Sequence, residues 1–120
     1  MKIGAFVAIM LAIVGGLIYA FINGQQPPAL STLPNEVVIY DVRTSEEYLS
    51  GHVKNATLLP LSDIESGTSP TVSKDTPIAV YCRSGNRSAE ATKLIKNMGF
   101  GKVIDMGGLK DVTKYGLKIE

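Results

Sequence analysis

The hydrophobic pattern of the chain is most uneven at its N-terminus. Residues 3–22 form a run of 20 positions without a charged side chain. A helix of that length spans about 30 Å, the hydrocarbon core of a bilayer. The apolar core of a cleaved signal peptide is shorter, roughly 7–15 residues, and large residues stand three positions before the two possible cleavage points. We therefore expect residues 1–22 to form a transmembrane anchor, with a cleaved signal sequence as the alternative.

The charges that flank this run indicate its orientation. Lys2 precedes the run and the next charged residue is Glu36, so the positive-inside rule keeps the N-terminus in the cytoplasm. We expect the remainder to be exported, periplasmic or extracellular, and held at the membrane by residues 3–22; after cleavage it would be soluble in the periplasm. Residues 23–34 carry three prolines and no charge, which is typical of an extended linker. Residues 35–120 remain as one domain.

Beyond the linker, short apolar runs predict the strands of a sheet. Residues 37–40 and 78–81 are continuous apolar runs rich in β-branched and aromatic side chains, which indicates strands buried on both faces. Further short apolar runs stand at 56–59 and 103–104. Residues 66–75 are rich in Ser, Thr, Gly and Pro without periodicity, and we expect a loop there.

Helical patterns stand between these runs. Thr44 and Glu47 have the spacing of a capping box, and Gly51 is suited to end the short helix that follows. Between Ser88 and Met98, apolar residues recur at steps of three and four, which predicts one face of a second helix. Because strands alternate with helices, the sequence predicts an α/β fold with a parallel sheet flanked by helices.

Composition and charge exclude several classes of function. Twelve Lys and Arg residues against 11 Asp and Glu give a net charge of +1, which does not fit a general nucleic-acid binder. The single cysteine, Cys82, excludes an intramolecular disulfide. Together with the single histidine, His52, it supplies too few ligands for a cysteine-built zinc site. We expect no metal, no cofactor and no nucleic-acid partner.

The cysteine stands where a parallel sheet places its ligands. Cys82 directly follows the strand predicted at 78–81, and such sheets bind ligands at the carboxyl ends of their strands. A polar loop and a helix follow it. Loop N–H groups, the helix N-terminus and the charges of Arg83 and Arg87 should all lower the pKa of the thiol. A thiolate in such a cradle is a nucleophile suited to anionic reactants.

A series of motifs resembles the single-domain rhodaneses, the small periplasmic or membrane-linked thiosulfate sulfurtransferases. The matching stretches are 41–44 with 47–48, 51–56, 59–61, 80–88, 98–100 and 107–109. Each is weak alone, but in this order they cover nearly all of residues 37–112. The resemblance implies a rhodanese-like parallel sheet with flanking helices, and sulfurtransferase activity.

The resemblance also implies a mechanism. The Cys82 thiolate would take the outer sulfur of thiosulfate or a similar small anionic donor, and a thiol or cyanide acceptor would remove it from the persulfide. The loop residues would bind donor and persulfide: Arg83, Ser84, Gly85, Asn86, Arg87 and Ser88. Asp41 and Arg43 would support nearby loops, and His52 would be a structural turn residue. Many relatives carry Trp where this chain has Leu109, which changes one wall of the pocket.

Loop length separates sulfur transfer from neighbouring chemistry. Cys82 and Arg87 have the spacing Cys-x4-Arg, whereas phosphatase and arsenate-reductase relatives carry the wider Cys-x5-Arg loop. An arsenate reductase also commonly needs further thiols, and this chain has none. Two alternatives stay open: a persulfide carrier or interaction module with little turnover, and, less favoured, a phosphatase or arsenate reductase.

Overall fold

The computed structural model describes residues 33–120. The expected anchor and nearly all of the expected linker lie in residues 1–32, outside the described part, so both stay predictions, as does the boundary of the domain. Within residues 33–120, no helix has both the length and the hydropathy needed to cross a bilayer.

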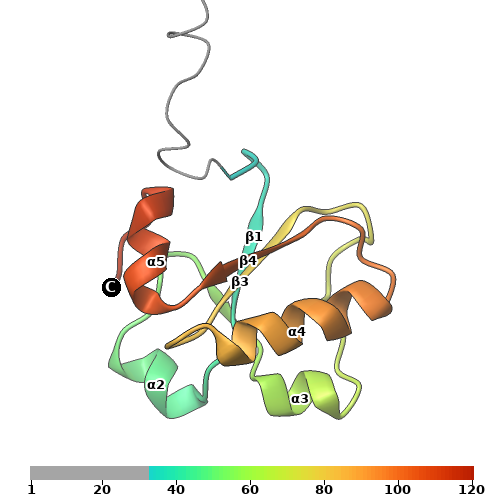
Figure 1. The fold of residues 1–120 in the computed structure, drawn as a ribbon, viewed down its shortest axis with the longest axis horizontal. Coiled ribbons are helices and arrows are strands. Elements are labelled where there is room, and N and C mark those ends of the chain that lie inside the picture. The colour runs from blue at the N-terminus through green and yellow to red at the C-terminus, as the bar shows by residue number, and fades with distance from the viewer. Residues whose placement is uncertain (1–32) are drawn as a thin grey trace, which may run out of the picture.

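Four parallel strands form the centre of the fold (Figure 1). They are β1 (Val38–Asp41), β2 (Thr57–Leu58), β3 (Ile78–Tyr81) and β4 (Val103–Gly107). Their order in the sheet is β2-β1-β3-β4, and every neighbouring pair is parallel. The predicted α/β class with a parallel sheet is therefore confirmed. The runs at 37–40 and 78–81, which are rich in β-branched and aromatic residues, form the central strands β1 and β3, and these are covered on both faces.

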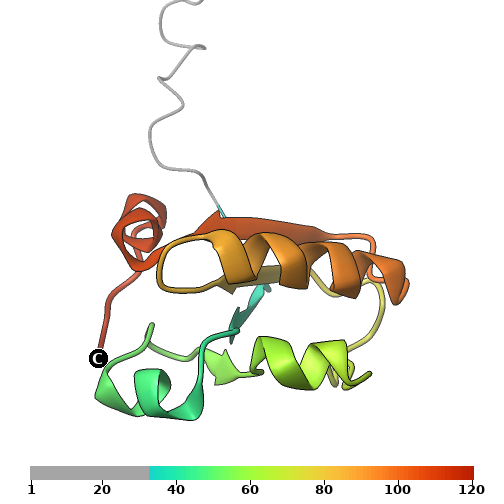
Figure 2. The same cartoon turned by 60° about the horizontal axis from the view of Figure 1, so that its bottom comes forward.

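Helices cover both faces of this sheet. They are α2 (Ser45–Ser50), α3 (Leu61–Glu65), α4 (Asn86–Asn97), α5 (Leu109–Val112) and a short 3-10 helix, η1 (Thr113–Tyr115). Figures 1 and 2 show α3 and α4 together on one face and α5 on the other. The hydrophobic core has two layers that match this arrangement. Ile64 of α3 and Ile95 of α4 pack in one layer, and Val112 of α5 packs in the other.

Successive residues of the central strand enter these two layers in turn. Ile78 and Val80 of β3 pack in the layer beneath α3 and α4, whereas Ala79 and Tyr81 pack in the opposite layer. Cys82 continues the first set and lies in the α3–α4 layer. The strand therefore brings the thiol to the carboxyl edge of the sheet with its side chain turned toward α4.

The helix boundaries agree with the sequence at α2 and differ at α4. Thr44 caps α2 by accepting a hydrogen bond from the Glu47 N–H at 3.3 Å, and Gly51 ends it. Helix α4 begins at Asn86, two residues before the predicted start at Ser88. The polar residues of its first turn carry no apolar periodicity, so the pattern starts only where the helix reaches the core.

Both weaker strands also differ in length from their apolar runs. Strand β4 continues to Gly107, beyond the apolar run at 103–104. The run ends early because β4 is an edge strand, in which exposed Asp105 alternates with buried Met106. Strand β2 is restricted to Thr57–Leu58 within the run at 56–59. In β4 the exposed face needs no apolar residue, and the apolar signal is therefore shorter than the strand.

Candidate active site

The Cys82 side chain is held at the carboxyl end of β3. Its backbone N–H donates to the Gly107 carbonyl oxygen at 2.9 Å, so the sheet still fixes the backbone at this residue. The residue is fully buried and belongs to the hydrophobic layer beneath α3 and α4. The reactive group therefore lies at the carboxyl edge of the sheet, below the surface of the loop that follows it.

The loop closes around the sulfur from the helix side. The Gly85 N–H donates to Cys82 Sγ at 2.9 Å. Gly85 has φ +103°, in the left-handed region, and this conformation turns its N–H back toward the sulfur. The buried Ser88 hydroxyl lies 3.6 Å from Sγ and 3.0 Å from the Gly85 carbonyl oxygen. The N-cap residue and the first turn of α4 thus each place a polar group beside the same sulfur atom.

These polar groups set the acidity of the thiol. Burial by itself would raise the pKa of Cys82, because water no longer solvates the thiolate. Hydrogen bonds with the Ser88 side chain and with the backbone of Ser88, Gly85 and Ser84 outweigh burial, so the pKa is lowered. The direction agrees with the sequence expectation. The groups that lower the pKa are the hydrogen-bonding groups of the loop, whereas the charges of Arg83 and Arg87, which the sequence also suggested, are not among its main causes.

Gly107, the last residue of β4, and Gly108, the N-cap of α5, form the floor of the loop. Gly108 pairs with Ser84 in an antiparallel bridge, and the Leu109 N–H donates to the Arg83 carbonyl oxygen at 3.1 Å. A Cβ atom on Gly108 would lie 2.6 Å from that same oxygen and 3.0 Å from Ser84 Cα. The loop backbone therefore occupies the space that a side chain at position 108 would need, which explains the glycine at this position in physical terms.

The two arginines of the loop have different surroundings. Arg87 forms a two-point ion pair with Glu47 of α2, Nη1 to Oε1 at 2.6 Å and Nη2 to Oε2 at 3.0 Å. Arg83 is exposed and forms no ion pair within the described residues. The sequence identified Glu47 only as a capping residue; its pairing with Arg87, 40 positions away, carries no local signal.

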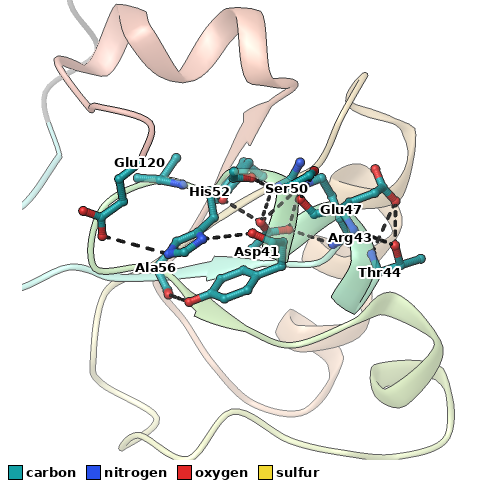
Figure 3. A network of polar contacts seen from close by, with 12 residues as sticks. Asp41, Arg43, Thr44, Glu47, Ser50, His52, Ala56 and Glu120 are labelled. Carbon is teal, nitrogen blue, oxygen red and sulfur yellow. Dashed lines mark hydrogen bonds and ion pairs between the residues drawn. The ribbon is translucent and has the colours of Figure 1, made fainter.

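Asp41 and Arg43 form a buried network at the end of β1. Arg43 Nη2 donates to Asp41 Oδ2 at 2.7 Å and to the Gly51 carbonyl oxygen at 2.6 Å. The Tyr81 hydroxyl donates to Asp41 at 2.6 Å and accepts from the Val53 N–H at 2.9 Å. Burial, followed by the hydrogen bond to Asp41, raises the pKa of Tyr81 well above its usual range. Asp41 and Arg43 (Figure 3) thus hold residues 51–53 against the sheet.

His52 is occupied by structural contacts. Its ring stacks on Tyr48 with a centroid distance of 3.8 Å, and Nδ1 lies 3.0 Å from the Tyr48 carbonyl oxygen. Nε2 lies 4.0 Å from Glu120 at the C-terminus (Figure 3). These contacts join α2 to the C-terminal segment and agree with the expected role as a turn residue.

A cavity of about 240 Å³ opens beside the loop. Its lining residues are Val42, Arg43, Thr44, Pro60, Leu61, Ser62, Glu65 and Arg87. Arg87 links it to the loop, and Val42 shares the hydrophobic layer of Cys82. Within residues 33–120, no three His, Cys, Asp or Glu side chains gather as a metal site would require.

Comparison with known proteins places this arrangement in a family. The model of the rhodanese-like domain matches residues 28–114, which is most of the chain. The chain belongs to the rhodanese-like domain family. Thiosulfate sulfurtransferase PspE of Escherichia coli is 36% identical over 79 residues, covering 65% of this chain and 76% of the relative. A sulfurtransferase of Allochromatium vinosum is 34% identical over 85 residues, covering 70% and 78%.

Solved structures show the same rhodanese-like fold. A structure described as rhodanese with anions from E. coli superposes with a TM-score of 0.58 at 34% identity, covering 62% of this chain and 89% of that chain. The rhodanese-like domain of the Anabaena protein Alr3790 gives a TM-score of 0.62 at 29% identity, covering 70% and 98%. The single rhodanese-like fold expected from the sequence motifs is therefore confirmed.

Proposed function

We propose that the chain is a sulfurtransferase that moves sulfane sulfur from thiosulfate, or a similar anionic donor, to a thiol or cyanide acceptor. One observation carries the proposal most strongly. Cys82 is fully buried, yet loop hydrogen bonds lower its pKa, so the site stabilises a sulfur anion out of water. Relatives named as sulfurtransferases support the same chemistry.

The reaction has two displacement steps. In the first, the Cys82 thiolate attacks the outer sulfur of thiosulfate, an S–S bond forms, and the bond to the sulfonate sulfur breaks to release sulfite with its electron pair. In the second, cyanide or a thiolate attacks the terminal sulfur of the persulfide and regenerates the Cys82 thiolate. Covalent catalysis of this kind divides one difficult transfer into two easier ones.

The loop groups have distinct tasks in these steps. The Gly85 N–H, 2.9 Å from Sγ, holds the thiolate in place before attack. The remaining loop N–H groups would stabilise the terminal sulfur of the persulfide anion, and exposed Arg83 would attract the anionic donor. Because Cys82 is fully buried, the side chains that cover it must move aside for the donor to reach Sγ.

Steady-state assay tests this proposal. The full chain, given thiosulfate and cyanide, should release thiocyanate with double-displacement kinetics, and Cys82→Ser should release none above the uncatalysed rate. Ser66→Ala is a suitable control, because Ser66 is exposed at the end of α3 and belongs neither to the loop nor to the lining of the cavity. A folded wild-type chain that releases no thiocyanate, or a Cys82→Ser variant that retains activity, would contradict the proposal.

Complete burial of Cys82 also favours a second candidate, a persulfide carrier with little turnover. A buried persulfide is protected from small acceptors in solution and would pass its sulfur only to a docked protein thiol. The carrier would gain sulfur from the donor but release little thiocyanate when cyanide is added.

We further propose that residues 3–22 anchor the domain to the membrane, with the N-terminus in the cytoplasm and the domain exported. The 20 uncharged positions and the placement of Lys2 support this arrangement. Membrane fractionation followed by intact mass tests it. Retention of residue 1 in the membrane fraction is expected, whereas a shortened, soluble chain in the periplasm would show a cleaved signal instead.

A further inference from the structure

The arginines of the described chain differ in how their charge is compensated. There are three, Arg43, Arg83 and Arg87, and the site gathers all of them at or near the loop and its cavity. Arg43 is paired with Asp41 at 2.7 Å and Arg87 with Glu47 at 2.6 Å. Among residues 33–120, Arg83 alone of the three forms no ion pair. Carboxylates thus cancel most of the positive charge beside the thiolate.

The partner of Arg87 is itself firmly held. Glu47 Oε1 accepts hydrogen bonds from Thr44 Oγ1 at 3.2 Å and from the Thr44 N–H at 3.4 Å, as part of the capping box of α2. Both oxygens of the carboxylate bind the guanidinium, which fixes its orientation as well as its position. The capping box of α2 therefore holds Glu47 in place, and Glu47 in turn holds Arg87 in the first turn of α4.

Arg87 lies close enough to the thiolate for its charge to matter. It stands in the first turn of α4, next to Ser88, whose hydroxyl contacts Sγ. The pKa of Arg87 is raised, chiefly by its hydrogen bond to Glu47 and in part by the charge of Cys82. A free guanidinium at this place would favour any anion that approaches the sulfur.

We propose that Glu47 limits the preference of Cys82 for anionic over neutral reactants, by holding Arg87 as a neutral pair beside the loop. This inference rests on the proposed function and deepens it, because it assigns donor selectivity to a residue outside the loop. Glu47 is a positioning residue in this account, since it acts through Arg87. Removal of its charge would leave two cations, Arg83 and Arg87, to attract the donor in place of one.

The substitution Glu47→Gln separates charge from structure. Glutamine also completes a capping box, so α2 keeps its N-terminal hydrogen bonds while the negative charge is lost. Glu46→Gln is the matched control: it removes the same charge from the neighbouring position of the same helix, where the side chain is exposed and has no ion pair within the described residues. Glu47→Asp restores the charge and should restore the wild-type behaviour in part.

Alkylation of Cys82 in the full chain measures the selectivity directly. The second-order rate constants for iodoacetate, an anion, and iodoacetamide, a neutral analogue, are compared as a ratio. A change in the pKa of Cys82 or in its accessibility alters both rate constants alike and leaves the ratio unchanged. A freed unit charge at a partly exposed site should raise the ratio about 3- to 10-fold in Glu47→Gln, and high salt should remove the increase.

The outcomes separate this inference from the proposed function. An increased ratio in Glu47→Gln, with Glu46→Gln at the wild-type value, supports it, and the KM for thiosulfate should then fall in the same variant. A ratio equal in wild type, Glu46→Gln and Glu47→Gln overturns it, even if sulfur transfer is intact. An increased ratio in a chain that transfers no sulfur would support the control of charge by Glu47 and contradict the proposed function.

Discussion

The substitution Gly108→Ala tests how closely the loop that follows Cys82 is packed, because it adds a single methyl group beneath that loop. The φ of −93° at Gly108 is open to any residue, so Gly108→Ala introduces no backbone strain. The added Cβ, however, would lie 2.6 Å from the Arg83 carbonyl oxygen, which is 0.8 Å short of the 3.4 Å at which ordinary contact begins. Because the neighbouring atoms are loop backbone, the loop itself must move away from the floor.

The expected cost follows from this displacement. Overpacking of a close-packed interior typically costs about 1–3 kcal/mol, and we expect Gly108→Ala to lose stability within that range. The same shift would pull the Gly85 N–H away from Sγ, where it now lies at 2.9 Å. Since a misplacement of about 1 Å at a reacting group can reduce the rate 100-fold, sulfur transfer should fall much further than stability.

Urea unfolding and thiocyanate release measure the two effects. Gly101→Ala is the matched control, because a Cβ at Gly101 meets no heavy atom within 4 Å and its φ lies outside the left-handed region. Equal stability and equal activity in the two alanine variants would refute the packing argument. Lost stability with normal activity would show that the loop moves without disturbing the thiolate.

Three further predictions follow from individual contacts. Ser88→Ala removes the hydroxyl 3.6 Å from Sγ, so the pKa of Cys82 should rise and the thiolate should form at higher pH, as measured by its ultraviolet absorbance. Tyr81→Phe leaves the buried Val53 N–H without its acceptor and should cost about 1–3 kcal/mol in urea unfolding. The pKa of Glu47 is lowered to about 2, chiefly by its hydrogen bond to Arg87, so the pair stabilises the fold above the ordinary value of 4.5 and is lost as pH falls toward 2. The stability advantage of wild type over Glu47→Gln should be about 1 kcal/mol at neutral pH and disappear near pH 2, as followed by acid titration of unfolding.

Each of these predictions has its own control and its own contrary result. If the pKa of Cys82 is unchanged in Ser88→Ala, or rises equally in Ser84→Ala, whose side chain is exposed, the Ser88 hydroxyl does not lower that pKa. Tyr40→Phe, whose hydroxyl has no hydrogen-bond partner within residues 33–120, should unfold like wild type. A stability difference for Glu47→Gln that stays constant from neutral pH to pH 2 would show that the ion pair contributes nothing.

Periodicity and strand composition predicted the framework of this domain because the central strands are buried on both faces. The runs at 37–40 and 78–81 correspond closely to β1 and β3, and the position of Cys82 after β3 placed the thiol at the correct edge of the sheet. The edge strands were less visible. Strand β4 buries only alternate residues, so exposed Asp105 interrupted its apolar run.

The polar architecture of the site is mostly beyond local sequence signals. Contacts such as Glu47 with Arg87 and Tyr81 with Asp41 each join residues 40 positions apart. The sequence indicated that Arg87 stands near the thiol, but not that a carboxylate cancels its charge. The sequence predicted that N–H groups of the loop would face the thiol, but it did not identify Gly85 as the donor to Sγ. A glycine in a loop before a helix favours such a turn.

The formation of a persulfide on Cys82 is the central claim, and intact mass spectrometry tests it most directly. The full chain is incubated with thiosulfate, freed of excess donor, and measured before and after addition of cyanide. We expect a gain of one sulfur atom in wild type, its loss on addition of cyanide with release of thiocyanate, and no gain in Cys82→Ser. A folded wild-type chain whose mass does not change, or a gain that persists in Cys82→Ser, would contradict it.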